Sequence, residues 1–209
     1  FDGPLGKPVA LRILPRPVQA ELPFWVTSAG NPDTFIAAGR LGANVLTHLL
    51  GQTIDELADK LKAYRLARKE AGHAGEGCVS LMLHSFVGPD ADAVRERVRR
   101  PLIEYLRSSM NLVKQYAWSF PAFKRREGMD TSPGAVDLQS LSPDEMDALL
   151  EHSFERYYET SGLFGTPESC LAMVDRMKAI GVDDVACLID FGIDSATVLE
   201  HLPYLNRLR

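Results

Sequence analysis

Near-continuous apolar runs, each followed by a helix-start signal, constrain the fold of this chain more than any other feature. Strands that are apolar along their whole length are typical of a parallel sheet with helices on both faces, or of a barrel ringed by helices. Strand followed by helix, several times over, predicts an α/β fold. The predicted strands are Val9–Leu14, Phe24–Ser28, Ala43–Leu50, Val79–Val87 and Asp184–Phe191.

Helix starts are marked by a recurring pattern. In four tripeptides we place Pro at the first helical position with an acid beside it, and three of the four begin with a capping side chain. They are Asn31-Pro32-Asp33, Gly88-Pro89-Asp90, Ser142-Pro143-Asp144 and Thr166-Pro167-Glu168. Thr53 with Glu56, and Ser142 with Glu145, also fit the capping box. Two of the predicted helices are Pro143–Tyr158 and Pro167–Ile180, the second stopped by Gly181.

One segment breaks the strand–helix alternation. Asn111–Leu141 is weakly patterned and contains a Lys124-Arg125-Arg126 cluster. A long segment of this kind inside a compact domain is usually functional or disordered. We interpret it as an insertion or lid within a single α/β domain over residues 1–209.

Composition excludes several classes of protein. A formal net charge of -5 over 209 residues argues against a nucleic-acid binder. No apolar run reaches the ~18 residues that would cross a membrane. The three cysteines, Cys78, Cys170 and Cys187, form no C-x-x-C pair, which argues against both a disulfide framework and a zinc site. We therefore expect a cytoplasmic protein.

The junction from Ser28 to Thr34 is the sharpest local signal of chemistry. A strand runs into a turn of small residues, and a helix begins at once, so backbone N–H groups converge as they do at anion sites. Ala29, Gly30 and Asn31 would let a phosphate approach the main chain, and the Thr34 hydroxyl would add a hydrogen bond. The alternative is a well-capped helix without a ligand.

Two histidines are predicted near the C-terminal ends of strands, where parallel α/β folds gather their ligands. His48 and His84 are our candidate catalytic residues, each able to bind a substrate oxygen or move a proton. For each, the alternative is a histidine satisfied by the backbone. Asp190, at the end of the last predicted strand, is a similar but weaker case.

The other polar features are weaker. His73, His152 and His201 show no metal-ligand spacing, so we predict no metal site. The basic run Arg95–Arg100 indicates a solvated helix face, with contact to an acidic partner as the alternative.

Longer stretches of the sequence resemble a known family. They are LPRPVQAELPFWVTSAGNPDTFIAAGRLGANVLTHLLGQTIDELADKLKAYRLAR, LMLHSFVG, RPLIEYL and GTPESCLAMVDRMKAIGVDDVACLIDFG. Together they resemble the bacterial luciferase-like flavin monooxygenases, and more narrowly the subgroup attached to polyketide and nonribosomal-peptide biosynthesis. The resemblance extends from about Val9 to Gly192.

This resemblance implies a TIM barrel that binds reduced FMN and activates dioxygen. In the family the turn after the fifth strand holds the flavin phosphate, which corresponds here to Gly30, Asn31 and Thr34. In the family the end of the sixth strand lies near the flavin ring, and His48 matches that position. His84 would end the seventh strand and face the same opening. The substrate would be a small molecule or an acyl or peptidyl group on a carrier protein, and a flavin reductase would supply the cofactor. Hydroxylation and Baeyer–Villiger insertion both remain open.

The resemblance covers only strands five to eight, whereas a complete barrel needs about 250 residues. We therefore expect the C-terminal half of a barrel, completed by a missing N-terminal half. Closure by a homodimer is an alternative. The alternative functions are a deazaflavin-dependent oxidoreductase and a non-catalytic docking or dimerisation module.

Overall fold

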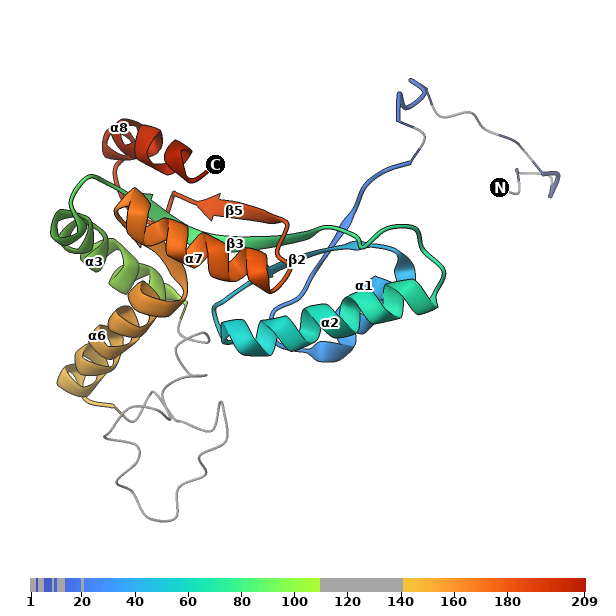
Figure 1. Ribbon diagram of the computed structural model, residues 1–209. Helices are drawn as coiled ribbons and strands as arrows, with labels where there is room; N and C mark the ends of the chain where they lie inside the picture. Colours follow the sequence, from blue (N-terminus) through green and yellow to red (C-terminus); the bar gives the residue numbers. More distant parts are fainter. Residues whose placement is uncertain (1–2, 4–5, 9, 11–13, 20, 110–140) are drawn as a thin grey trace, which may run out of the picture.

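A five-stranded parallel sheet with helices packed along it forms the body of the chain (Figure 1). The computed structural model describes residues 3, 6–8, 10, 14–19, 21–109 and 141–209. In chain order the elements are β1 (Trp25–Thr27), α1 (Pro32–Leu41), β2 (Asn44–His48), α2 (Ile54–Glu70), β3 (Val79–Val87), α3 (Ala91–Ser108), α6 (Pro143–Thr160), β4 (Gly162–Gly165), α7 (Pro167–Ala179), β5 (Asp184–Leu188), α8 (Ser195–Leu205) and the short 3-10 helix η2 (Asn206–Leu208).

Strand β3 is the centre of the sheet. It pairs with β2 through residues 79–82, with β5 through residues 80–84 and with β4 through residues 84–87. Strand β1 pairs with β2, and every one of these pairings is parallel. Among the described residues, β1 and β5 each pair with one strand only. The predicted α/β class is confirmed.

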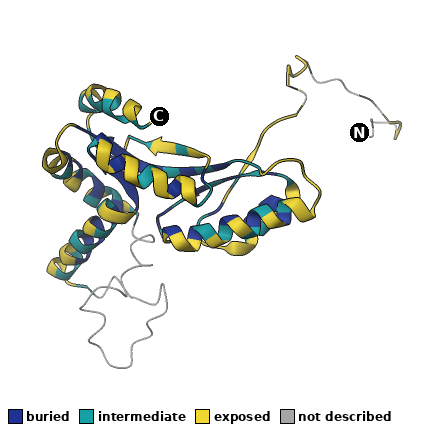
Figure 2. Cartoon of the chain, viewed as in Figure 1, coloured by how far each residue is buried: buried dark blue, intermediate teal, exposed yellow. Residues whose placement is uncertain are grey.

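One face of the sheet, which we call the outer face, is covered by α1, α2 and α7. Val45, Leu81 and Leu83 on this face are at most 1% exposed. They share a hydrophobic core with Phe35 of α1 and the apolar stripe of α2. Figure 2 shows the same buried stripe along the sheet-facing sides of these helices. The central strands of this face are therefore buried within the chain, whereas Cys187 of β5 on the same face is exposed.

The opposite face, which we call the inner face, is only partly covered. Because side chains alternate along a strand, the residues between those of the outer face point to it. Leu46 and Met82 lie there half-buried, and Trp25 is 44% exposed, with its indole N–H donating to Ser80 Oγ over 3.2 Å. The inner face extends over four strands, because four residues in register lie side by side on it: Thr27, Leu46, Ser80 and Asp184. An incomplete barrel with an open interior has this arrangement.

A helical hairpin of α3 and α6 closes the C-terminal end of the inner face. Leu102 and Leu106 of α3 pack against Leu150 and Phe154 of α6, and Phe86 at the end of β3 joins the same cluster. In Figure 1 the two helices lie at one end of the sheet. The hairpin is an excursion between β3 and α7 rather than another strand–helix unit.

The basic run of α3 has its acidic partner within the same chain. Arg95 contacts Glu155 and Glu159, Arg99 contacts Glu151, and Arg107 contacts Asp147. The spacing of about four residues on both helices makes this an antiparallel ladder of ion pairs along the hairpin. The run Arg95–Arg100 is largely a solvated helix face, as predicted: Arg97 and Arg100 are exposed, and Arg95 and Arg99 also pair with α6. Contact with a separate acidic partner stays a prediction.

Helix starts follow the predicted pattern with one exception. Pro32, Pro143 and Pro167 are the first residues of their helices, and both predicted capping boxes are present. At Gly88-Pro89-Asp90 the prediction is wrong. Asp90 is the N-cap and accepts from the Ala93 amide, so α3 begins one residue after Asp90 and Pro89 lies outside it.

Four of the five predicted strands are found, three of them shorter than expected. β2 ends at His48 and β5 at Leu188, because the chain leaves the sheet for the turns that follow. Strand β4 and helix α8 were not predicted. Most of the predicted strand Val9–Leu14, and of the predicted insertion Asn111–Leu141, lies outside the described residues, and neither Ala10 nor Leu14 is in a strand.

Candidate functional site

The parallel strands end at a common edge, and the turns that leave this edge carry the predicted site residues. In parallel α/β folds, ligands bind beyond the carboxyl ends of the strands. The turn after β1 holds residues 28–31, β2 ends at His48, and the turn after β5 holds Asp190. Because β1 and β2 are neighbours, the bend at residues 28–31 and His48 belong to the same part of the edge.

The bend before α1 is open to solvent. Gly30 and Asn31 are exposed, Ala29 and Thr34 are half-buried, and a Cβ at Gly30 would meet no atom within 4 Å. Two amides of the first turn are already used: the Asp33 amide donates to the Asn31 side chain over 3.0 Å, and the Thr34 amide donates to the Asn31 carbonyl over 3.2 Å. The approach along the backbone at Gly30 is unobstructed.

These residues fit a phosphate as a cradle made of backbone and hydroxyl groups. The N-terminus of a ten-residue helix attracts an anion, and nothing blocks its approach to Gly30. No Lys or Arg occurs between Ser28 and Thr34, and the Asp33 carboxylate lies in the first turn. A dianion held here would therefore need a cation from another part of the site.

His48 ends β2 on the inner face, with its ring half-buried. The Leu50 amide donates to His48 Nδ1 over 3.1 Å. A nitrogen that accepts this bond carries no proton, so the neutral ring has its proton on Nε2. Burial lowers the pKa of His48 below its usual value. His48 thus offers a neutral N–H donor to whatever lies over this part of the inner face.

A buried glutamine supports the turn after β2, and the sequence analysis did not predict it. Gln52 is 3% exposed, and its Nε2 donates to the His48 carbonyl over 2.6 Å and to Thr47 Oγ1 over 3.0 Å. Its Oε1 accepts from Lys60 Nζ of α2 over 2.8 Å. A polar residue in a turn gives no sequence signal for such burial, because one of its partners comes from α2.

His84 lies near the C-terminal end of its strand, as predicted, but it is more enclosed than a position at the mouth of the site would be. Strand β3 continues to Val87, so His84 lies within the strand and is 3% exposed. Its ring meets the edges of Tyr105 and Phe191 at centroid distances of 4.4 and 5.3 Å. Burial, with a smaller contribution from His48, lowers the pKa of His84 to about 4. Its Nε2 has no hydrogen-bond partner in the described structure.

The sheet therefore brings the predicted residues together only in part. His48 and His84 share the inner face on adjacent strands, with His48 in register with Met82, two residues before His84. His84 is enclosed by Tyr105 and Phe191, whereas His48 is not enclosed. Asp190 is exposed and lines a cavity of about 360 Å³ together with Arg100 and Tyr105. The catalytic role assigned to each histidine stays a prediction.

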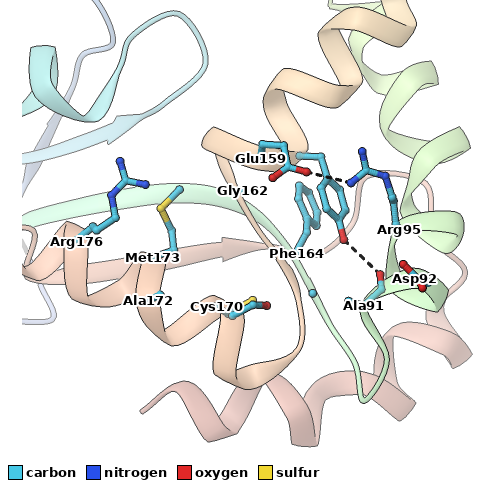
Figure 3. Close-up of a pocket in the computed structure, with 13 residues that line it drawn as sticks. Ala91, Asp92, Arg95, Glu159, Gly162, Phe164, Cys170, Ala172, Met173 and Arg176 are labelled. Atoms are coloured by element: carbon cyan, nitrogen blue, oxygen red, sulfur yellow. Dashed lines mark hydrogen bonds and ion pairs between the residues drawn. The ribbon is translucent and has the colours of Figure 1, made fainter.

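A separate cavity of about 400 Å³ lies between α3, the end of α6, β4 and α7 (Figure 3). Tyr158 stacks on Phe164 at 5.3 Å, and the Arg95 guanidinium lies 4.6 Å from the centre of the Tyr158 ring. Arg95 is also paired with Glu159, so its charge is already neutralised within the chain. Burial raises the pKa of the Cys170 thiol in this cavity to about 11, which keeps it protonated. The stack of Tyr158 on Phe164 attaches the hairpin to β4.

The described residues contain no group of three or more His, Cys, Asp or Glu side chains that could hold a metal ion. None of the described helices is long and apolar enough to cross a membrane.

Comparisons with known proteins agree with this fold. The family model for luciferase-like monooxygenases matches residues 1–184. A search of the curated proteins found no match.

Three solved structures illustrate the structural similarity. The oxygenating constituent of 3,6-diketocamphane monooxygenase from Pseudomonas putida, a type II Baeyer–Villiger enzyme in complex with FMN, has a TM-score of 0.56 at 15% identity, with 89% of this chain and 46% of that one covered. Monooxygenase RslO1 from Streptomyces bottropensis has a TM-score of 0.54 at 18% identity, with 92% of this chain and 51% of that one covered. The coenzyme F420-dependent tetrahydromethanopterin reductase from Methanopyrus kandleri has a TM-score of 0.54 at 16% identity, with 90% of this chain and 51% of that one covered. The chain thus spans about half the length of these proteins.

Proposed function

Since the chain belongs to the luciferase-like monooxygenase family, we propose that it forms the C-terminal half of a flavin-dependent monooxygenase that uses reduced FMN and dioxygen. Reduced FMN would supply the electrons that activate dioxygen, and this chain would bind and orient the cofactor. The protein would act in the cytoplasm, where a flavin reductase would supply the reduced cofactor.

The accessible bend at residues 29–31, just before α1, is the observation that carries this proposal. Gly30, Asn31 and Thr34 would hold the phosphate of FMN, because the backbone at Gly30 is unobstructed and the helix dipole favours negative charge there. His48, on the neighbouring strand, would lie towards the flavin ring. The phosphate and the ring would then rest on the same edge of the sheet.

The partner proposed for the inner face is an N-terminal half barrel. Strands β1 and β5 each pair with one strand only, so each has an edge that another strand could pair with. Trp25 and Met82 leave apolar area exposed on the inner face, which a partner would bury. The span of about half the length of the solved structures supports the same partner. That half would also bring the cation that residues 28–34 lack. The alternative is a homodimer, in which two copies of this chain would together close the barrel.

The proposed substrate is a natural-product intermediate, either free or carried as an acyl or peptidyl group on a carrier protein. Support for it comes from the resemblance of the quoted sequence blocks to the subgroup attached to polyketide and nonribosomal-peptide biosynthesis. The fold neighbour RslO1 is itself a monooxygenase.

A deazaflavin-dependent oxidoreductase is the second candidate. It is favoured by the structural similarity to the F420-dependent reductase, which at a TM-score of 0.54 is comparable to that of the two monooxygenases. Both candidates would use the same anion cradle, because deazaflavin F420 also carries a phosphate.

Parallel titrations with FMN, riboflavin and F420 test the proposal. Riboflavin lacks the phosphate, so we expect FMN to bind at least about tenfold more tightly, as expected for a few hydrogen bonds to a charged group. The variant Gly30→Ala has room for its methyl group, so it should fold as the wild type does and lose the preference for FMN. Thr34→Ala should reduce that preference in part.

The outcomes separate the candidates. Tight F420 binding with weak FMN binding would favour the deazaflavin enzyme. Equal binding of FMN and riboflavin, or an unchanged preference in Gly30→Ala, would remove α1 as the phosphate site. If a longer protein that contains this chain binds FMN and the 209-residue chain does not, the N-terminal half is needed. If neither binds a flavin, the docking module is favoured.

A further inference from the structure

The turn after β2 fixes one histidine from two sides. The Leu50 amide donates to His48 Nδ1, and the Gln52 side chain donates to the His48 carbonyl. The first bond sets the ring and its tautomer, and the second sets the backbone from which the ring extends. Both partners lie within four residues of His48, so the arrangement is local and rigid.

The orientation of the Gln52 amide is itself determined. Lys60 Nζ can only donate, so the atom of Gln52 that it contacts is the acceptor Oε1. Nε2 therefore faces the His48 carbonyl and Thr47 Oγ1, and both of its hydrogens are used. A connected series of hydrogen bonds runs from α2 through the turn to the end of β2. Buried polar networks that are fully satisfied in this way hold their members in one arrangement.

The remaining ring atom, Nε2 of His48, is the one left for a ligand. His48 lies on the inner face in register with Met82, on the strand next to the bend at residues 28–31. Nδ1 is taken by the chain's own backbone, so Nε2 is at the distal edge of the ring. The unpartnered Nε2 of the neighbouring His84, 3% exposed, is a second polar atom that the described chain leaves unsatisfied on this face.

We propose that His48 serves this site as a neutral hydrogen-bond donor through Nε2, and that Gln52 positions its ring for that purpose. The proposal rests on the proposed function, since the acceptor would be an uncharged carbonyl oxygen or ring nitrogen of the flavin or substrate. The charged phosphate belongs at α1 instead. Thr47 and Lys60 act through Gln52 and touch no ligand.

Nuclear magnetic resonance tests the positioning directly. Long-range 1H–15N spectra of the full chain at neutral pH distinguish the two neutral tautomers and the imidazolium ion. We expect His48 to show the Nε2–H form alone. Gln52→Glu keeps the size of the side chain and the contact with Lys60 but places a carboxylate oxygen against the His48 carbonyl, which can only accept, so it should mix the tautomers. Lys60→Met should change them less.

Two substitutions of His48 test the donor. His48→Asn keeps an acceptor for the Leu50 amide but has no atom at the position of Nε2, whereas His48→Gln keeps an N–H near that position. We expect FMN affinity to fall about fivefold in the Asn variant, the contribution of one neutral hydrogen bond, and to stay within about twofold of wild type in the Gln variant. The rate at which dioxygen reoxidises bound reduced FMN is measured beside the affinity.

The outcomes separate this proposal from the proposed function. Wild-type affinity and reoxidation rate in His48→Asn, or an Nδ1–H or charged ring in the spectra, would overturn the donor role. If Gln52→Glu leaves the tautomer unchanged, the positioning role is lost. If the wild type binds no flavin, the proposed function fails, while the Nε2–H tautomer and its loss in Gln52→Glu would still support positioning by Gln52.

Discussion

The two faces of the sheet differ in how far the helices of the chain cover them. On the outer face Leu81 and Leu83 are at most 1% exposed beneath helices, whereas Met82 between them is half-buried on the inner face. In the run Val79–Val87 apolar side chains point to both faces, although the inner face also carries Ser80 and His84. Strands with apolar residues on both sides are expected where both faces of a sheet are covered. Helices of the chain cover most of the outer face, whereas most of the inner face is left open, and the N-terminal half barrel that we propose would cover it.

The inner face is not uniform, and its two histidines show this. His84 lies where Tyr105 of α3 and Phe191 cover the face, and it is almost fully buried. His48, one strand away, is only half-buried. The α3–α6 hairpin therefore covers one end of the face and leaves the strand ends near α1 accessible. A site that must admit a cofactor needs this kind of opening.

The strongest test of the comparison uses neighbouring residues of β3. Leu81→Ala should lower the free energy of unfolding of the chain by about 2–5 kcal/mol, because it leaves a cavity in the helix-covered core. Met82→Ala should cost less than about 1 kcal/mol, because that side chain already contacts solvent. Denaturant unfolding of the two variants measures both values.

The same pair reports whether a partner covers the inner face. In a longer protein with an N-terminal half barrel, the cost of Met82→Ala should rise towards that of Leu81→Ala, since Met82 would then be enclosed. Equal costs in the 209-residue chain would contradict the distinction between the faces. An unchanged small cost in the longer protein would argue against the inner face as the docking surface.

Local signals predicted the helices well and the strands less completely. The caps at Asn31, Thr53, Ser142 and Thr166 act within four residues, so the sequence alone contains their cause. Strand β4 is four residues long with glycine at both ends, and it forms because it pairs with the end of β3, more than seventy residues earlier. Such a pairing leaves no local pattern.

The candidate site was predictable to a similar degree. Strand ends and the small-residue bend pointed to His48 and to residues 29–34, because those features are local. The burial of His84 depends on Tyr105, which arrives from α3, and that of Gln52 on Lys60, which arrives from α2. Their protonation and orientation follow from contacts between elements, and the sequence pattern does not contain these contacts.

The covered end of the inner face predicts a pH dependence of stability. The pKa of His84 is lowered to about 4 in the folded chain from an ordinary value of 6.5. Between these values the unfolded chain binds a proton that the folded chain does not, so stability is full above about pH 6.5 and falls as the pH drops towards 4. The expected loss is roughly 2–3 kcal/mol over that window. Unfolding in denaturant at a series of pH values measures it.

A matched variant separates His84 from the carboxylates that titrate in the same range. His84→Phe retains an aromatic ring between Tyr105 and Phe191 and cannot be protonated. Its stability should fall less between pH 6.5 and 4 than that of the wild type, and the difference is the contribution of His84. Parallel pH profiles would mean that His84 is accessible to protons in the folded chain, and the contrast with His48 would disappear.

The smallest effect concerns what holds the two helices of the hairpin together. Arg107 and Asp147 pair at 2.8 Å on the exposed side of α3 and α6, while leucines fill the contact between the helices. Asp147→Asn keeps the shape and removes the charge, so we expect a loss of about 0.5 kcal/mol at low salt, as for other exposed pairs. In about 1 M salt the difference from wild type should vanish, because screening then acts within about 3 Å.

Leu102→Ala, at the apolar contact, is the control and should cost about 2–5 kcal/mol at either salt concentration. If Asp147→Asn instead lowered stability as much as Leu102→Ala, the ion-pair ladder and not the apolar contact would be the main interaction between α3 and α6.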